Sequence, residues 1–252
     1  MIRDVAGSYR RALIETVHHY SGWRPEAAVI DALKGEGAWN NDWEASYELL
    51  RRWGNGAVAL PDFADLVKVF GDFYFGGDPE GDPDQWQGFI GCEPLLVSAG
   101  FFADLNQAGF LWGFVSGAEP PSVRYVLQQR LGLAKPPVLA MGDAPDKPDP
   151  TGLLQLAGQI CEQRLGSRLG AAAPVVAYLG DTVADVQTVV NARQVAPEQR
   201  LISLAVAPPH LHGADQSEAR HHYEQRLSQA GADRILSHTA AVITTLGNLL
   251  DA

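Results

Sequence analysis

Short apolar runs alternate with segments of helical periodicity from residue 96 to the C-terminus, and this alternation most constrains the fold. The apolar runs are Gly109 to Val115, Val138 to Met141, Val175 to Leu179, Leu201 to Val206 and Arg234 to Leu236. Predicted helices begin at Pro121, Thr151 and Thr182, and a final helix ends at Leu250. Strands that alternate with helices form βα units, so the pattern predicts an α/β domain over residues 96–252 with a mainly parallel sheet.

The first 95 residues follow a different pattern, one of helices and loops. Apolar residues recur at helical spacing in Ser8 to Val17, in Glu44 to Trp53 and from Pro61 to Phe70. Asn41 stands three residues before Glu44, which is close to a capping box. A segment rich in Gly, Pro and Asp follows at 76–84 and predicts a solvated loop. We therefore expect a separate helical domain over residues 1–95.

Charge and cysteine content exclude several classes of protein. The 252 residues include 30 acidic and 19 basic side chains, for a net charge of −11. Without a basic patch, such a chain is a poor candidate for binding nucleic acid or an anionic membrane. Neither a bilayer-spanning apolar run nor a signal peptide is recognisable, so we expect a cytoplasmic protein. Cys92 and Cys161 form no Cys-x-x-Cys pair, which argues against a thiolate zinc site or a disulfide framework.

Polar residues follow three of the predicted strands. Ser116 and Gly117 come after the first apolar run, Lys147 lies in a Pro-rich segment after the second, and Asp181 and Asp185 follow the third. Ligands of parallel sheets bind at the carboxyl ends of the strands. A hydroxyl and an ammonium group can bind an anion such as phosphate, and a pair of carboxylates suits Mg²⁺. Together they suggest phosphoryl transfer.

Each of these residues also has a purely structural interpretation. Ser116 could form a turn, Lys147 could be a solvated loop residue, and Asp181 could only cap a helix. Asp185 could be an exposed acid in the first helical turn. Their order and common placement favour a site. The pairs His210-x-His212 and His221-His222 lack nearby Cys or Glu ligands, and we expect them in a surface loop.

The order strand–Ser116-Gly117, then Lys147-Pro-Asp-Pro, then Gly-Asp181-x-x-x-Asp185 resembles motifs two, three and four of the haloacid dehalogenase (HAD) superfamily. The helical first part is similar to the cap of its phosphoglycolate-phosphatase-like branch. The resemblance implies a HAD-like, Rossmann-type parallel core with an N-terminal α-helical cap. It also implies a Mg²⁺-dependent phosphatase that acts on a small phosphorylated metabolite through an aspartyl-phosphate.

The resemblance further implies a role for each residue. Ser116 would bond the transferring phosphoryl group and Lys147 would neutralise it, while Gly117 lets backbone N–H groups approach. Asp181 would hold Mg²⁺, and Asp185 would orient the water shell of the metal or complete its site. One departure is that Ala118-Glu119-Pro120-Pro121 stands where relatives would show Arg-Pro after the Gly. This places an acid near the expected phosphate pocket.

The first motif of the superfamily, Asp-x-Asp-Gly after an apolar strand, does not occur in the chain. Met1-Ile2-Arg3-Asp4-Val5 matches only the tail of that motif. We therefore expect the first core strand, which carries the nucleophile, to be absent from this chain, and the chain as written to be inactive. Two explanations stay open: a start codon assigned too late, or a true truncation that leaves a catalytically inactive binding or regulatory protein.

Dehalogenation on the same scaffold is a further alternative, which the Asp181 and Asp185 pair disfavours because that reaction needs no Mg²⁺. The sequence identifies neither the substrate nor the oligomeric state.

Overall fold

The structure is a computed structural model that describes residues 1–56 and 59–250. Contacts within the chain divide it into two compact units. One comprises Arg3–Pro94 and is called the helical unit. The other comprises Met1–Ile2 with Leu95–Ala252 and is called the α/β unit. Each unit is described by itself.

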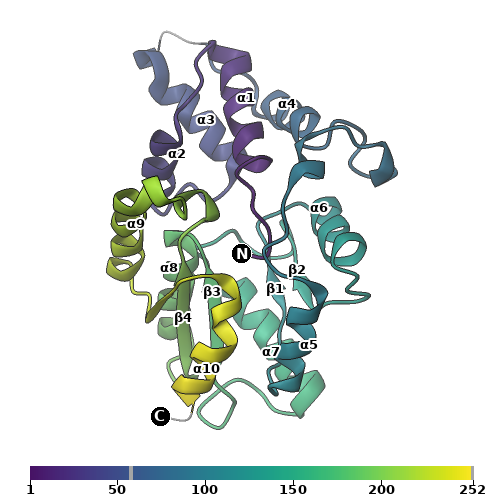
Figure 1. Cartoon of the computed structure of the whole chain (residues 1–252), viewed down its shortest axis with the longest axis vertical. Coiled ribbons are helices and arrows are strands. Elements are labelled where there is room, and N and C mark those ends of the chain that lie inside the picture. Colours follow the sequence, from purple (N-terminus) through teal and green to yellow (C-terminus); the bar gives the residue numbers. More distant parts are fainter. Residues whose placement is uncertain (57–58, 251–252) are drawn as a thin grey trace. The chain divides into compact units, whose positions relative to one another are not determined.

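The helical unit contains α1 (Tyr9–Ser21), α2 (Ala27–Lys34), α3 (Asp42–Arg52) and α4 (Phe63–Tyr74), with short 3₁₀ turns at Trp53–Gly56, Pro83–Gln85 and Phe89–Cys92. Helix α1 packs against α3 and α4 (Figure 1). Leu13 and Val17 of α1 and Phe70 of α4 are fully buried in this core. The side chain of Asn41 accepts hydrogen bonds from two N–H groups of the first turn of α3 and caps that helix. Burial of these apolar faces, more than helix propensity, stabilises short helices of this kind.

A buried polar cluster joins the two ends of the helical unit. Glu93 is 1% exposed and accepts hydrogen bonds from Arg3 and Ser8, both at 2.6 Å, and from the Tyr74 hydroxyl at 3.1 Å. Burial alone would lower the pKa of Arg3, but Tyr74 and Glu93 raise it above its usual value. The guanidinium group therefore stays charged beside the Glu93 carboxylate.

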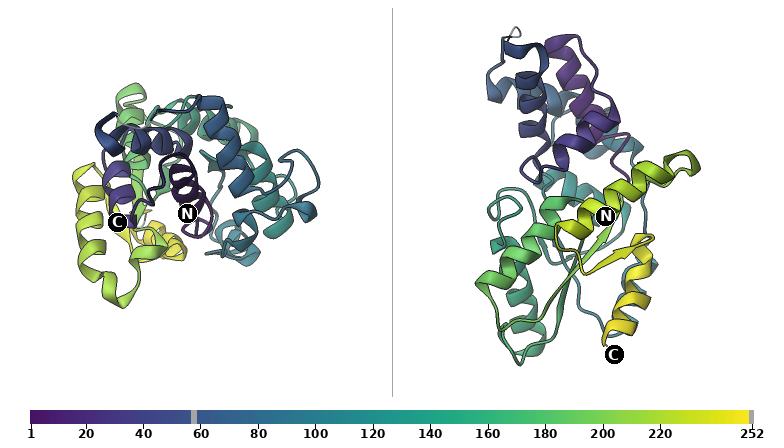
Figure 2. Two further views of the ribbon diagram at one scale, coloured as in Figure 1. Left: turned by 90° about the horizontal axis from the view of Figure 1, so that it is seen from above. Right: turned by 90° about the vertical axis from the view of Figure 1, so that its left-hand side faces the viewer.

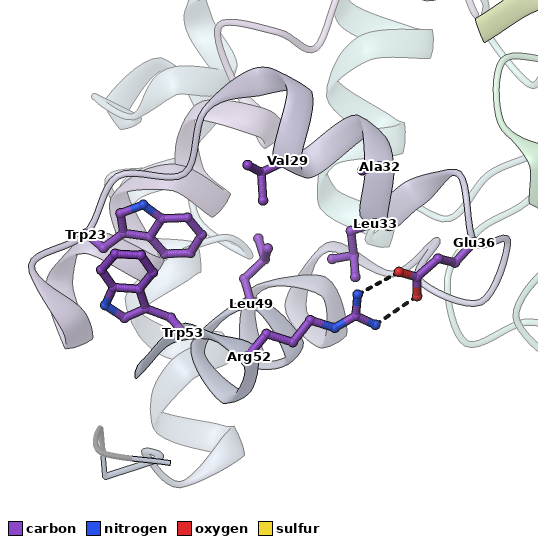
Figure 3. Close-up of a pocket in the computed structure, with 8 residues that line it drawn as sticks. All are labelled: Trp23, Val29, Ala32, Leu33, Glu36, Leu49, Arg52 and Trp53. Carbon is purple, nitrogen blue, oxygen red and sulfur yellow. Dashed lines mark hydrogen bonds and ion pairs between the residues drawn. The ribbon is translucent and has the colours of Figure 1, made fainter. Parts of the chain in front are cut away.

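A groove of about 200 Å³ lies between α2 and the end of α3 (Figure 3). Trp23 and Trp53 stack at one end with their ring centroids 4.3 Å apart, and aliphatic side chains line the middle. At the other end Arg52 makes two hydrogen bonds to Glu36 and one to Glu48. The charge of Arg52 is thus balanced within the helical unit.

The α/β unit contains five short strands and six α-helices among its described residues. The strands are β1 (Phe114–Val115), β2 (Val138–Leu139), β3 (Val176–Gly180), β4 (Leu201–Val206) and β5 (Arg234–Leu236). The helices are α5 (Ala99–Gln107), α6 (Pro120–Arg124, continued by a π-helical segment Tyr125–Arg130), α7 (Thr151–Leu165), α8 (Val183–Val195), α9 (Ser217–Gln229) and α10 (Val242–Leu250). Helices α8 and α10 lie on opposite sides of β3 and β4 (Figures 1 and 2).

The strands form two separate parallel sheets, in the orders β1-β2 and β3-β4-β5. The predicted α/β class with parallel strands is confirmed. Strands β4 and β5 have the predicted bounds, whereas β1 covers only the end of the predicted run from Gly109. The N–H groups of Gly109 and Phe110 bond back to carbonyls of α5, so this part of the run terminates a helix instead of forming a strand.

Strand β3 lies at the edge of its three-stranded sheet. All six residues of β4 are buried, but Val176 to Leu179 of β3 are only half-buried. The Val176 N–H group bonds to the Arg200 carbonyl. Residues of a parallel strand turn alternately toward its two neighbours, so the N–H groups of Ala177 and Leu179 point away from β4. An apolar strand with such an open edge is unusual, since parallel strands are normally covered.

Helix α9 was not predicted, and it contains His221 and His222. The expectation that these two residues lie in a loop was therefore wrong. The segment is so polar that only Tyr223 and Leu227 of α9 are buried, four residues apart. None of the helices in the described part of the chain combines the length and apolar character that crossing a bilayer requires.

Candidate active site

The junction between β3 and α8 holds the Asp185 carboxylate in place. Thr182 caps α8, and the Thr182 and Asp185 side chains form a capping box. Oδ2 of Asp185 accepts hydrogen bonds from the N–H groups of Asp181 and Thr182 at 3.2 and 3.1 Å, and from the Thr182 hydroxyl at 2.8 Å. Asp185 is 4% exposed. Of the two acids that stand four residues apart, Asp185 is thus a buried carboxylate that stabilises the start of α8.

Lys147 reaches this carboxylate from the loop after β2. Its Nζ lies 2.6 Å from Oδ1 of Asp185, and the two side chains are 14% and 6% exposed. Burial alone would lower the pKa of Lys147, but Asp185 raises it above the usual lysine value. Burial would likewise raise the pKa of Asp185, but Lys147 and Thr182 hold it below the usual value of a carboxyl group. Both groups are therefore charged at neutral pH.

The loop that carries Lys147 is held by several hydrogen bonds. The Asp149 N–H group bonds to the Asp146 carbonyl at 3.0 Å, and the Asp149 side chain accepts from Thr151 N–H at 2.8 Å. The Asn191 side chain of α8 donates to the Pro148 carbonyl at 2.9 Å. The Lys147–Pro148 peptide bond is cis. The hydrogen bonds of Asp149 and Asn191 hold the main chain that follows Lys147.

Tyr178 belongs to the same cluster, although the sequence pattern did not predict it. Its hydroxyl donates to Oδ1 of Asp185 at 3.2 Å and lies 3.5 Å from the carbonyl of Val115, the last residue of β1. Burial raises the pKa of Tyr178. The signal available in the sequence was a hydroxyl within an apolar strand, three residues before Asp181. Tyr178 thereby links the Lys147–Asp185 pair to the strand that precedes Ser116.

Ser116 and Gly117 lie at the end of β1, as the sequence predicts from their place after the apolar run. The Ser116 hydroxyl accepts a hydrogen bond from Ala118 N–H at 3.1 Å, and the Ser116 N–H group bonds to the Leu139 carbonyl of β2 at 2.8 Å. Ser116 is half-buried and Gly117 is exposed. Their contact with a phosphoryl group stays a prediction.

The two predicted metal ligands lie at the junction between β3 and α8. Both oxygens of Asp185 accept hydrogen bonds, and Asp181 is half-buried directly after β3. Within residues 1–56 and 59–250, no group of three or more His, Cys, Asp or Glu side chains could hold a metal ion. Mg²⁺ commonly takes one or two carboxylates together with water and substrate oxygens. Direct coordination by Asp181 stays a prediction, and the hydrogen-bonded oxygens of Asp185 suit an indirect role.

Comparison with known proteins shows that several solved structures have a similar fold. The structure is similar to a phosphonoacetaldehyde hydrolase-like protein from Oleispira antarctica, with a TM-score of 0.62, 16% identity and coverage of 98% of this chain and 87% of that one. A predicted phosphoglycolate phosphatase from Haemophilus somnus 129pt gives a TM-score of 0.62 at 13% identity, covering 97% and 93% of the two chains. Phosphatase Tt82 from Thermococcus thioreducens gives 0.56 at 18% identity, covering 90% and 95%. The chain therefore shares its fold with these three proteins.

Sequence comparison is less informative. No family model matches the chain. A curated imidazoleglycerol-phosphate dehydratase from Phytophthora nicotianae is 27% identical over 188 residues, which is 74% of this chain. This chain spans only 38% of the length of that relative.

Proposed function

We propose that this protein is a Mg²⁺-dependent phosphatase of the HAD type that hydrolyses a small phosphorylated metabolite through an aspartyl-phosphate. One observation carries the proposal. The Tyr178 hydroxyl touches both Asp185, which binds Lys147, and Val115, which precedes Ser116. The Lys147 ammonium and the Asp185 carboxylate therefore belong to one cluster with Tyr178, and the residue before Ser116 contacts it. A hydroxyl, an ammonium and a carboxylate are groups that phosphoryl transfer needs, which supports the proposal.

The proposal gives each residue a role. Ser116 and the N–H groups around Gly117 bind the transferring phosphoryl group, and Lys147 neutralises its charge. Asp181 would supply a carboxylate ligand to Mg²⁺, which when bound stabilises negative charge on the phosphoryl oxygens. Asp185 keeps Lys147 charged and in place. The helical unit acts as a cap that selects the substrate.

The nucleophile of this mechanism would be an Asp on a strand between β3 and β1, which we propose is encoded upstream of Met1. The edge of β3 that faces away from β4 supports this additional strand. The N–H groups of Ala177 and Leu179 point to that edge and are available to pair with it. The other side of the gap is β1, which bonds to β2 through the N–H groups of Phe114 and Ser116. The backbone N–H and C=O groups of Val115, between these two residues, point away from β2. One parallel strand would pair with both edges and join the two sheets.

The test starts from the DNA upstream of Met1. In-frame codons are expected to encode an apolar strand followed by Asp-x-Asp-Gly. The protein that includes them is expected to hydrolyse p-nitrophenyl phosphate only with Mg²⁺, and Asp181→Asn to remove nearly all turnover. Asp215→Asn, an exposed acid of the same unit, is the control and should keep full activity.

The 252-residue chain alone is expected to show no turnover, because charge and positioning do not replace an absent nucleophile. Full activity of Asp181→Asn, or activity in excess chelator, contradicts the Mg²⁺ site. An in-frame stop codon within ten codons upstream contradicts the additional strand and favours an inactive, ligand-binding protein.

A further inference from the structure

Helix α8 holds the Lys147 loop at two points. Asp185, in the first turn of α8, binds the Lys147 ammonium group at 2.6 Å. Asn191, further along α8, donates from Nδ2 to the Pro148 carbonyl at 2.9 Å. The first contact fixes the tip of the side chain, and the second fixes the main chain one residue after it.

The ion pair does not by itself determine where the lysine stands. A lysine side chain has a flexible four-carbon stem and a compact charge that pairs with a carboxylate from many directions. A contact at the adjacent carbonyl removes this freedom, because it ties the base of the stem to the same helix that carries the carboxylate.

The position of Asn191 fits this role. Asparagine is a weak helix former, because its side chain competes for nearby backbone groups. Asn191 lies well inside α8, is half-buried, and bonds a carbonyl 43 residues away in the chain. Its amide is therefore used for a tertiary contact with the loop.

We infer that Asn191 is a positioning residue that sets the place of the Lys147 ammonium group at the carboxyl edge of the sheet. A catalytic role for Lys147 at this position rests on the proposed function. The anchoring itself does not, so the two can fail separately.

The experiment measures the acetylation rate of each lysine by mass spectrometry in the 252-residue protein. The chain contains only Lys34, Lys68, Lys135 and Lys147, so three lysines serve as internal references. Asn191→Leu keeps the approximate size and removes the donor. We expect the rate of Lys147 relative to the other lysines to rise roughly tenfold, since its side chain is 14% exposed when anchored and a loosened loop exposes it to the reagent more often.

Gln194→Leu removes an exposed amide from the same helix and should leave the relative rate of Lys147 unchanged. Asn191→Asp keeps the shape but sets an acceptor against the Pro148 carbonyl, and it should accelerate Lys147 as well. If Asn191→Leu fails to melt cooperatively, Asn191→Asp decides the question alone. A Lys147 rate that stays at the wild-type value in a folded variant overturns the inference, whatever the protein hydrolyses.

Discussion

Gly180 ends strand β3 with its α-carbon against the Asp185 side chain. A Cβ atom at Gly180 would lie 2.2 Å from Cβ of Asp185 and 2.4 Å from its Cγ. These distances are too short for any side chain. The glycine of the Gly-Asp pair therefore makes room for the carboxylate that binds Lys147.

We predict that Gly180→Ala lowers the free energy of unfolding by about 1–3 kcal/mol, the usual cost of overpacking a core. The reason is that Asp185 must move and give up hydrogen bonds. Urea denaturation measures the change. The matched control is Gly247→Ala in α10, where the added methyl group meets nothing within 4 Å. That substitution should be neutral or stabilise by up to about 1 kcal/mol. Equal effects of the two substitutions would contradict the steric argument.

At the scale of elements, Glu93 connects the start of α1 to the end of α4. Ser8 precedes α1, Tyr74 ends α4, and Arg3 comes from the segment that enters the helical unit. The Arg3 side chain is 11% exposed and that of Glu93 is 0% exposed. A charge pair at such a place is costly to break, because one charge is left buried without its partner.

We predict that Glu93→Gln destabilises the helical unit by about 3–5 kcal/mol, because Arg3 would stay charged and uncompensated. Thermal and urea unfolding, followed by far-UV circular dichroism, measure the loss. The exposed pair Lys68–Asp72 of α4 provides the control, since Asp72→Asn should cost less than about 1 kcal/mol. Similar losses in both variants would show that burial of the Arg3–Glu93 pair does not determine the loss of stability.

At the scale of the whole molecule, the organisation of the sheet has consequences for stability. The α/β unit has a well-buried strand, β4, and beside it a half-buried edge strand, β3, that carries the candidate site. Amides that point to an open edge have no partner on a neighbouring strand and exchange with solvent through small local fluctuations.

Hydrogen exchange followed by NMR tests this description. In the 252-residue protein, the amides of Ala177 and Leu179 are expected to exchange at least about tenfold faster than that of Tyr178, which points to β4. In a protein that carries the proposed upstream strand, the amides of Ala177 and Leu179 should become as protected as that of Tyr178. Strong protection in the short protein would mean that another group already covers this edge.

Much of the fold was readable from local pattern. The bounds of β4 and β5 and the start of α7 follow from apolar runs and helix-start signals that act over a few residues. Helix α9 and the short β1 were not readable in this way. A polar helix with two buried residues has almost no periodic signal, and the apolar run from Gly109 could equally end a helix or form a strand.

The sequence by itself determined the α/β class and the order of Ser116, Lys147, Asp181 and Asp185, because strand–helix alternation and residue chemistry are local properties. Only the tertiary structure decided the partners of these residues. Asp185 binds Lys147 across 38 residues, Tyr178 reaches Val115 across 63, and Asn191 reaches Pro148 across 43. The physical reason is that such contacts depend on how strands and helices pack, and no local pattern records which side chain will face a distant loop.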